Sequence, residues 1–356
     1  MKIYRNIYLA IFMFCFSVIV FCCTFFNFQL AKVSNDDTLI DVTIEQGSIR
    51  NIAKTLKKKD LIKSETFFEI YVRVTGKTNL MAADYQISQN MGVREIVELL
   101  SSGKGVNNNQ IKITFREGLN MRGIINVICK ETSNGEDDVF NLLNDSSYLK
   151  GLIDKYWFLS NDILDEGVYY SLEGYLYPNT YSFNSKDVSV KEIFSSMLNE
   201  TDKKLSKYKK DISDNSFSVH EILTMASLIE LEALKVDDRN NVASVFFNRL
   251  DSNMTLGSDV TTYYASKIDM GDRDLYTSEL NDCNDYNTRC ATFKGLPIGP
   301  ICNPSITSVE AVLNPSSTNY YYFVADINGD VHFSKNSTEQ ANTIYRLKRD
   351  GLWYQY

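Results

Sequence analysis

An uninterrupted apolar run opens the chain, and after it apolar and polar residues alternate with the periods of helices and strands. Residues 7–26, IYLAIFMFCFSVIVFCCTFF, contain no charged side chain. At about 1.5 Å of rise per residue, such a run spans a hydrocarbon core of about 30 Å. The pattern therefore predicts a transmembrane helix at residues 7–27, preceded by a stub of residues 1–6.

Charges on the two sides of this helix predict its orientation. Lys2 and Arg5 precede the helix, and three aspartates follow it within the predicted linker, residues 28–41. The positive-inside rule then leaves the stub in the cytoplasm and everything after the helix outside. A cleaved signal peptide is the alternative, but its apolar region is normally shorter and ends in small residues, whereas this run ends in Phe25 and Phe26. We expect a single-pass cell-membrane protein with an extracytoplasmic catalytic domain.

In residues 42–105, apolar residues recur with the spacing of a strand in some segments and of a helix in others, in close succession. This pattern predicts a small α+β unit. The predicted order is a strand in VTIEQ, a turn at Gly47, helices through residues 49–56 and 67–72, a strand at 81–87 and a helix at 93–100. This order resembles the LysM-like module of cell-wall proteins. The alternative is an adaptor that binds no sugar, and the pattern leaves open which of the two is present.

Residues 218–234 are predicted to form an amphipathic helix that carries one carboxylate within its apolar stripe. Ser218 and Glu221 form a capping box that begins the helix. At about 100° per residue, Ala226 and Ala233 point in nearly the same direction as Glu230, while Glu232 points away. Burial against an apolar wall raises the pKa of a carboxyl, and such a group can serve as a general acid. Glu230 is therefore the candidate catalytic residue; the alternative is a Glu that reaches solvent or pairs with an arginine.

Composition limits the possible classes of protein. A chain that is 44% hydrophobic and 12% aromatic can form two domains with substantial cores after the apolar run. The net charge of −8 argues against nucleic acid as a partner. With only two histidines and no metal-binding spacing, we expect no metal and no cofactor. Cys283 and Cys290 lie close enough in sequence for a disulfide, which the sequence alone leaves undecided.

Several ordered motifs carry a resemblance to a known family. They are LEGYLYPNTYSF (172–183), MASLIELEA (225–233), VASVFFNRL (242–250), LGSDVTTYYA (256–265), DYNTRC (285–290), GLPIGPICNP (295–304) and YYFVAD (321–326). Together they resemble the endolytic murein transglycosylases of the MltG (YceG-like) family, over residues 42 to about 345. The resemblance implies a larger mixed α/β catalytic domain at 110–356, after the LysM-like module.

The same resemblance implies a reaction. Enzymes of this family cleave the bond between N-acetylmuramic acid and N-acetylglucosamine without water, leaving a 1,6-anhydro end, and the first Glu of the motif, here Glu230, acts as acid and then as base. A hydrolase would need a second carboxyl about 5 to 9.5 Å away. Asp259 and Glu173 are candidates for that second carboxyl. The alternatives are that Asp259 caps a helix and that Glu173, in a predicted aromatic strand-turn-strand element, anchors backbone amides.

Polar and aromatic residues on the predicted loops are the expected contacts to glycan. The predicted substrate-binding residues are Asn248, Arg249, Ser258, Asp259, Tyr286, Asn287, Thr288, Gly299, Asn303 and Glu173. Gly257, Val260 and Gln340 depart from residues common in the family, which puts contacts near them in doubt. Expected partners are peptidoglycan glycan strands, the cytoplasmic membrane and cell-wall synthases. The competing functions are an inactive peptidoglycan-binding scaffold and a muramidase that uses water.

Overall fold

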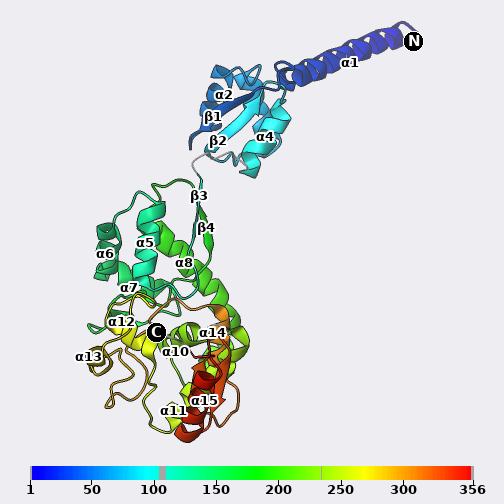
Figure 1. Ribbon diagram of the computed structural model, residues 1–356. Coiled ribbons are helices and arrows are strands. Elements are labelled where there is room, and N and C mark those ends of the chain that lie inside the picture. Colours follow the sequence, from blue (N-terminus) through cyan, green and yellow to red (C-terminus); the bar gives the residue numbers. More distant parts are fainter. Residues whose placement is uncertain (1, 104–109, 234, 354–356) are drawn as a thin grey trace. The chain divides into compact units, whose positions relative to one another are not determined.

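The computed structural model describes residues 2–103, 110–233 and 235–353, with side chains described from residue 12 onward. The chain divides into two compact units, Met1–Gln110 and Ile111–Tyr356 (Figure 1). The second unit begins at Ile111, and the sequence-based prediction begins the larger domain at residue 110. Residues 104 and 105, the predicted end of the small module, and residues 354–356 lie outside the described residues.

The first helix, α1 (Lys2–Leu30), leads directly into the N-terminal unit (Figure 1). Its segment Phe12–Leu30 is long and apolar enough to cross a membrane. The helix extends past the predicted end at residue 27, and Leu30 is buried in the core of the unit. Strand β1 begins at Leu39, so much of the predicted linker, 28–41, belongs to the folded unit. Burial of Leu30 and the backbone bonds of Val33 and Ser34 to Gln89 hold this segment in place.

The remaining N-terminal elements confirm the predicted order of strands and helices. They are β1 (Leu39–Ile44), α2 (Ile49–Lys58), α3 (Glu65–Val74), β2 (Ala83–Ser88) and α4 (Val93–Ser102). The two strands pair antiparallel, with Val42 opposite Tyr85. Ser48 and Ser64 cap the two central helices by accepting hydrogen bonds from backbone N–H groups. Apolar residues from every one of these elements, including Val42, form a separate core.

The second unit is a mixed α/β structure in which helices surround two-stranded sheets. Its α-helices and strands are β3 (Ile111–Thr114), α5 (Met121–Glu131), α6 (Glu136–Leu143), α7 (Ser146–Lys155), β4 (Thr180–Phe183), α8 (Val190–Leu205), α9 (Lys209–Ser213), α10 (Val219–Glu232), α11 (Arg239–Asp251), α12 (Asp259–Ala265), α13 (Thr277–Leu280), α14 (Ile306–Leu313), β5 (Tyr322–Ala325), β6 (Val331–Ser334) and α15 (Ser337–Arg349). Strand β3 pairs antiparallel with β4, and β5 with β6.

The predicted aromatic strand-turn-strand at residues 172–183 is only half correct. Its second part is β4, which pairs with β3 rather than with residues 172–177. Those residues form turns, and Gly174 has a φ of +84°, which favours glycine. A side chain at that position would also collide with the ring of Pro300. Close packing against a distant loop has therefore replaced the strand that local alternation predicted.

Helix α10 lies at the centre of the second unit, where it packs against α11, α12 and α14 (Figure 1). Ser218 and Glu221 form the predicted capping box. The helix is not amphipathic as predicted, because it is buried almost all round from His220 to Ile229. The hydroxyls of Thr224 and Ser227 donate to backbone carbonyls of the same helix, which allows polar residues to be buried. Residue 234, within the predicted helix, lies outside the described residues.

Candidate active site

Glu230 lies in the last turn of α10, and its side chain is only 6% exposed. Its Oε1 pairs with the Nη2 of Arg239 at 2.9 Å. Its Oε2 accepts hydrogen bonds from the Ser305 backbone N–H at 2.9 Å, the Ser305 hydroxyl at 2.6 Å and the Ser308 hydroxyl at 2.7 Å. Every one of these contacts is a donor to the carboxylate, so the predicted apolar wall around Glu230 is wrong. The carboxylate occupies a polar, charge-compensated site within the apolar core.

Arg239 links Glu230 to the start of α14. It is the first residue of α11, its side chain is 7% exposed, and it also donates to the hydroxyls of Ser305 and Thr307. Ser305 is the N-cap of α14, so the helix dipole adds to the positive environment of the Glu230 carboxylate. Three helices, α10, α11 and α14, thus meet at one buried ion pair. The pairing with an arginine is the alternative that sequence analysis had left open.

Glu232, two residues further on, has a different set of partners. Its Oε1 accepts a hydrogen bond of 2.5 Å from the hydroxyl of Ser258. Desolvation raises the pKa of Glu232 to about 7; the Ser258 hydrogen bond opposes this shift, nearby Asp259 adds to it, and Arg249 and Arg289 lower it. The two glutamates of the motif therefore face separate environments, as the helical projection requires, but Glu232 is half-buried rather than solvated.

Glu173 is fully buried and connects three parts of the unit. Its Oε2 accepts the backbone N–H of Met121 at 2.8 Å and the hydroxyl of Tyr264 at 3.1 Å, and its Oε1 accepts the side-chain amide of Asn303 at 3.1 Å. Burial raises the pKa of Glu173 to about 8, although the bonds from Met121 and Tyr264 and the charge of Arg122 partly oppose the shift. The backbone bond is the anchoring role that sequence analysis gave as the alternative to catalysis.

The raised pKa of Glu173 predicts a pH-dependent stability. Its ordinary value is 4.5 and its folded value about 8, so the folded state holds the proton more tightly than the unfolded state. The stabilisation is therefore complete below about pH 4.5 and is lost as the pH rises toward 8, by an amount on the order of a few kcal/mol. We expect the melting temperature of the second unit, followed by Trp157 fluorescence, to fall across this range.

The matched variant is Glu173→Gln, which cannot titrate. Its melting temperature will be lower than that of the parent at acidic pH, because one acceptor is lost, but its pH slope between 5 and 8 will be clearly shallower. Glu232 contributes a smaller slope of the same sign, so Glu232→Gln serves as the comparison. An unchanged slope in Glu173→Gln would show that this carboxyl does not titrate in that range.

Tyr286, Asn287 and Thr288, which sequence analysis predicted to contact glycan, have buried side chains. The Tyr286 hydroxyl accepts the backbone N–H of Tyr169. Asn287 donates to the carbonyls of Glu279, Leu280 and Asp282, all on the segment that precedes it. The hydroxyl of Thr288 accepts the backbone N–H of Ser258. These polar side chains satisfy backbone groups of this region.

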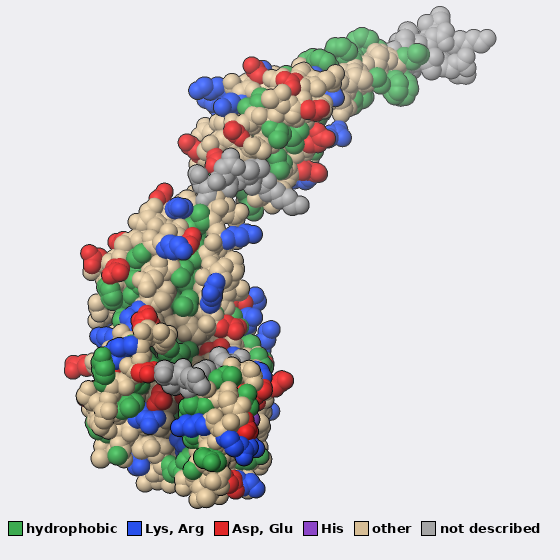
Figure 2. Space-filling view, in the orientation of Figure 1, with side chains coloured by type: hydrophobic (Ala, Val, Ile, Leu, Met, Phe, Trp, Pro, Cys, Tyr) green, Lys and Arg blue, Asp and Glu red, His purple; other side chains and the backbone are tan. Residues whose placement is uncertain are grey.

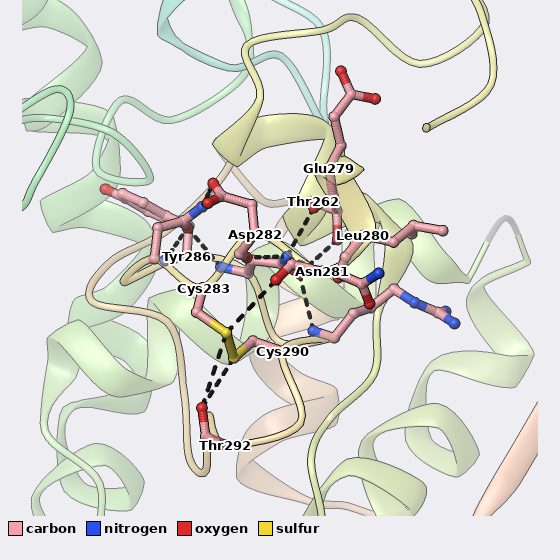
Figure 3. The surroundings of a disulfide bond; sticks show 12 residues. Thr262, Glu279, Leu280, Asn281, Asp282, Cys283, Tyr286, Cys290 and Thr292 are labelled. Carbon is pink, nitrogen blue, oxygen red and sulfur yellow. Dashed lines mark hydrogen bonds between the residues drawn. A yellow bond between two sulfur atoms is a disulfide. The ribbon is translucent and has the colours of Figure 1, made fainter. Parts of the chain in front are cut away.

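A disulfide closes the same loop. Cys283 and Cys290 are bonded across a sequence separation of 7 residues, which settles the pairing that the sequence left undecided (Figure 3). Thr292 lies beside both sulfur atoms (Figure 3). The bridge encloses the buried residues Tyr286 and Asn287. It therefore restricts the loop that supports α12 and Ser258.

Asn248 and Arg249, at the end of α11, donate hydrogen bonds to backbone carbonyls. Asn248 donates to Thr318 and Tyr320, and Arg249 donates to Tyr321 and to Leu256. These bonds hold the strand leading into β5 against α11. They support the structural helix-end role that sequence analysis gave as the alternative to substrate contact.

Ser258, Asp259, Gly299 and Asn303 complete the predicted set. Ser258 is the N-cap residue of α12, and Asp259 is its first residue, so Asp259 does not occupy the capping position that sequence analysis gave as its alternative role. Asp259 is exposed and forms an ion pair with Arg289. Gly299 is buried, and a side chain there would approach the ring of His220. Asn303 is buried and accepts the backbone N–H of Leu176.

A pocket of about 280 Å³ lies beside the C-terminal end of α10, where Leu231 forms part of its wall. Its lining residues are Gly118, Leu119, Asn120, Gly123, Leu231, Val260, Tyr263, Tyr264, Ile268, Asp269, Met270 and Ile301. Gly118 connects the pocket to the candidate residue: a Cβ at this position would lie 3.4 Å from Leu231 and 3.8 Å from the Cγ of Glu230. Sequence analysis missed this pocket, apart from Val260, because its walls come from segments far apart in the chain.

The structure shows the surroundings of the three residues that depart from the family pattern. Gly257 has a φ of +61° and lies beside Arg249, so glycine suits a turn there. Val260 lines the pocket, and the amide of Gln340 donates to the Phe323 carbonyl.

Within the described part of the chain, no group of three or more His, Cys, Asp or Glu side chains is arranged to hold a metal ion.

Comparisons with known proteins agree with one another. The YceG-like family matches residues 42–346. A Bacillus subtilis protein named endolytic murein transglycosylase is 38% identical over 313 residues, which cover 87% of this chain and 85% of that protein. A Streptococcus pneumoniae protein of the same name is 29% identical over 327 residues, covering 87% of this chain and 59% of the longer relative. A crystal structure of a YceG-like protein from Listeria monocytogenes aligns with a TM-score of 0.62 at 35% identity, covering 87% of this chain and 100% of the other.

Proposed function

The chain belongs to the YceG-like family, and we propose that it is an endolytic lytic transglycosylase that cleaves peptidoglycan glycan strands. The observation that carries this proposal is the position of Glu230, a buried carboxylate at the end of α10 beside a pocket, in a chain closely related to a protein named for this activity. Buried, precisely held carboxyl groups are typical of acid–base catalysts.

In the proposed reaction, Glu230 acts alone and twice. As an acid it donates its proton to the oxygen that links N-acetylmuramic acid to N-acetylglucosamine, and the bond from the muramoyl C1 to this oxygen breaks. As a base it then takes the proton of the muramoyl C6 hydroxyl, whose oxygen bonds to C1 and closes the 1,6-anhydro ring. The proton lost in the first step is regained in the second, so no water and no cofactor are consumed.

The surroundings of Glu230 favour the ionised state from which the second of these steps starts. Arg239 and the donors from Ser305 and Ser308 stabilise the carboxylate anion, which is the form that accepts a proton. The first step needs the protonated form. We therefore propose that glycan binding weakens one of these contacts, which frees Glu230 to act as the acid of the first step.

The pocket beside Leu231 is the proposed sugar subsite. Its walls combine apolar groups such as Ile301 and Met270 with the polar side chains of Asn120 and Asp269. A sugar ring presents an apolar face and a rim of hydroxyl groups, which matches this combination. The resemblance of the N-terminal unit to a LysM-like module suggests a second contact with glycan, and cell-wall synthases remain proposed partners.

The products of purified peptidoglycan digestion test the proposed reaction. The full-length protein in detergent should release fragments that end in 1,6-anhydromuramic acid, each lighter by one water than the corresponding reducing end. Mass spectrometry distinguishes the competing functions: reducing ends alone would indicate a muramidase, and no fragments at all would indicate a scaffold. The buried position of Glu173 and the ion pair of Asp259 make either residue a poor second carboxylate for a muramidase.

The proposed location is the cell membrane, with the N-terminus inside and both folded units outside. The apolar segment Phe12–Leu30 and the basic residues before it support this arrangement. A reporter enzyme fused after residue 40 should be active only on the outer side, and the mature protein should keep its N-terminus. Recovery of a processed form starting near residues 25–30 would contradict the anchor.

A further inference from the structure

Helix α3 carries an apolar face that begins against α1 and continues without a partner in the described structure. Phe67 contacts the rings of Phe25 and Phe26, with centroid distances of 5.7 and 5.6 Å. Ile70 and Val74, three and seven residues further along α3, lie on the same side of the helix as Phe67. Ile70 is 40% exposed and Val74 is 79% exposed. Two large aliphatic side chains are thus presented next to the apolar helix α1.

The contacts also fix the direction of α3 relative to α1. Lys63, just before α3, donates to the carbonyl of Phe28 at 3.2 Å and lies over the Phe28 ring at 4.0 Å. Phe67, in the first turn of α3, contacts Phe25 and Phe26. As the chain advances from 63 to 67, its contacts move back along α1, from residue 28 toward the apolar span. The first turn of α3 therefore lies beside the end of the apolar span, and Ile70 and Val74 continue the same face of α3 from there.

Cationic side chains gather at the end of α1. Lys63 contacts Phe28, the Arg94 guanidinium donates to the side chain of Asn27 at 3.0 Å, and Lys32 donates to Asn90. Lysine and arginine at the end of an apolar span commonly lie at the level of lipid headgroups. The junction is firm, because Leu30 is buried in the core of the N-terminal unit. The last residue of α1 is therefore part of the core of this unit.

We infer that the N-terminal unit rests on the lipid bilayer through α3, with Ile70 and Val74 inserted into the interfacial region beside α1 (Figure 2 shows the hydrophobic side chains along α1). This inference rests on α1 being a membrane anchor, as proposed above. The occupant of this apolar face is lipid. Such a contact fixes the tilt of the N-terminal unit and its distance from the membrane.

Depth-dependent quenching of tryptophan tests the inference in the full-length protein. Val74→Trp and Ile70→Trp are reconstituted in vesicles with and without bromine on the lipid acyl chains near the headgroup. Lys54→Trp, on the exposed side of α2, is the matched control in the same unit. The native Trp157 and Trp353 both lie in the second unit, so their signal is subtracted using the parent protein. We expect brominated lipid to quench the added fluorescence roughly twofold or more at 70 and 74, and little at 54.

Vesicle flotation, measured on the same samples, distinguishes a failure of the α3 contact from a failure of the α1 anchor. Flotation without quenching at 70 and 74 would overturn the inference while leaving the anchor intact. Equal quenching at 54, 70 and 74 would also overturn it, because the contact would then not belong to α3. Protein that fails to float would refute the anchor itself, and the α3 contact with it.

Discussion

Glu230→Gln should abolish glycan cleavage, with a loss of at least about 10²-fold to 10⁴-fold in turnover. The amide keeps the shape of the side chain and an acceptor for Arg239, but it can neither donate nor accept the transferred proton. Because one residue serves both steps, both are lost together. The measurement is the release of anhydro-ended fragments from purified peptidoglycan, per mole of folded protein. The assay temperature must lie below the melting temperature of the variant, since the ion pair with Arg239 is also lost.

Glu232→Gln is the matched control on the same helix. It keeps an acceptor for the hydroxyl of Ser258 and resembles the protonated form that a pKa of about 7 makes common near neutrality. We expect at least a few tenths of the parental rate. If Glu232→Gln were inactive and Glu230→Gln active, with both proteins folded, the assignment of the catalytic residue on α10 would be wrong.

Arg239→Met should cause the largest loss of stability in the second unit. It leaves the Glu230 carboxylate, 6% exposed, without its counter-ion, and breaking a buried pair in this way costs about 3 to 5 kcal/mol. For a domain of this size, that corresponds to a fall in melting temperature of roughly 6 to 20 °C. Thermal unfolding followed by Trp157 fluorescence measures the change.

Arg289→Met provides the comparison at an exposed ion pair. Arg289 and its partner Asp259 are 40% and 57% exposed, and such pairs contribute about 0 to 1 kcal/mol. In the double variant Glu230→Gln/Arg239→Met no buried charge remains unpaired, so the loss should be smaller than the sum of the two single losses. Similar small losses in Arg239→Met and Arg289→Met would contradict the buried pair.

Sequence reasoning succeeded where the deciding interactions are local. The capping box of Ser218 and Glu221 forms within four residues, and it begins α10 as predicted. The order of strands and helices in the N-terminal unit was also predicted, because apolar periods and the turn at Gly47 act over a few residues. The opposite directions of Glu230 and Glu232 follow from helix geometry alone.

Sequence reasoning failed where partners come from distant parts of the chain. Glu230 receives its hydrogen bonds from Ser305 and Ser308, which lie 75 and 78 residues further along. An amphipathic pattern predicts an apolar neighbour for a buried carboxyl, but burial of a charge requires donors, and only the fold brings them together. The same reason explains why α10, predicted to face solvent on one side, is covered on nearly all sides.

The loop between Cys283 and Cys290 shows the same contrast between local and distant interactions. Its sequence determined that Tyr286, Asn287 and Thr288 would lie in an irregular, polar segment, and the spacing of Cys283 and Cys290 allowed a bridge. Only the tertiary structure decided that the bridge forms and that these polar groups turn inward. Irregular backbone has no regular hydrogen-bond ladder of its own, so when it is buried its carbonyls and N–H groups must be satisfied by side chains such as the Asn287 amide.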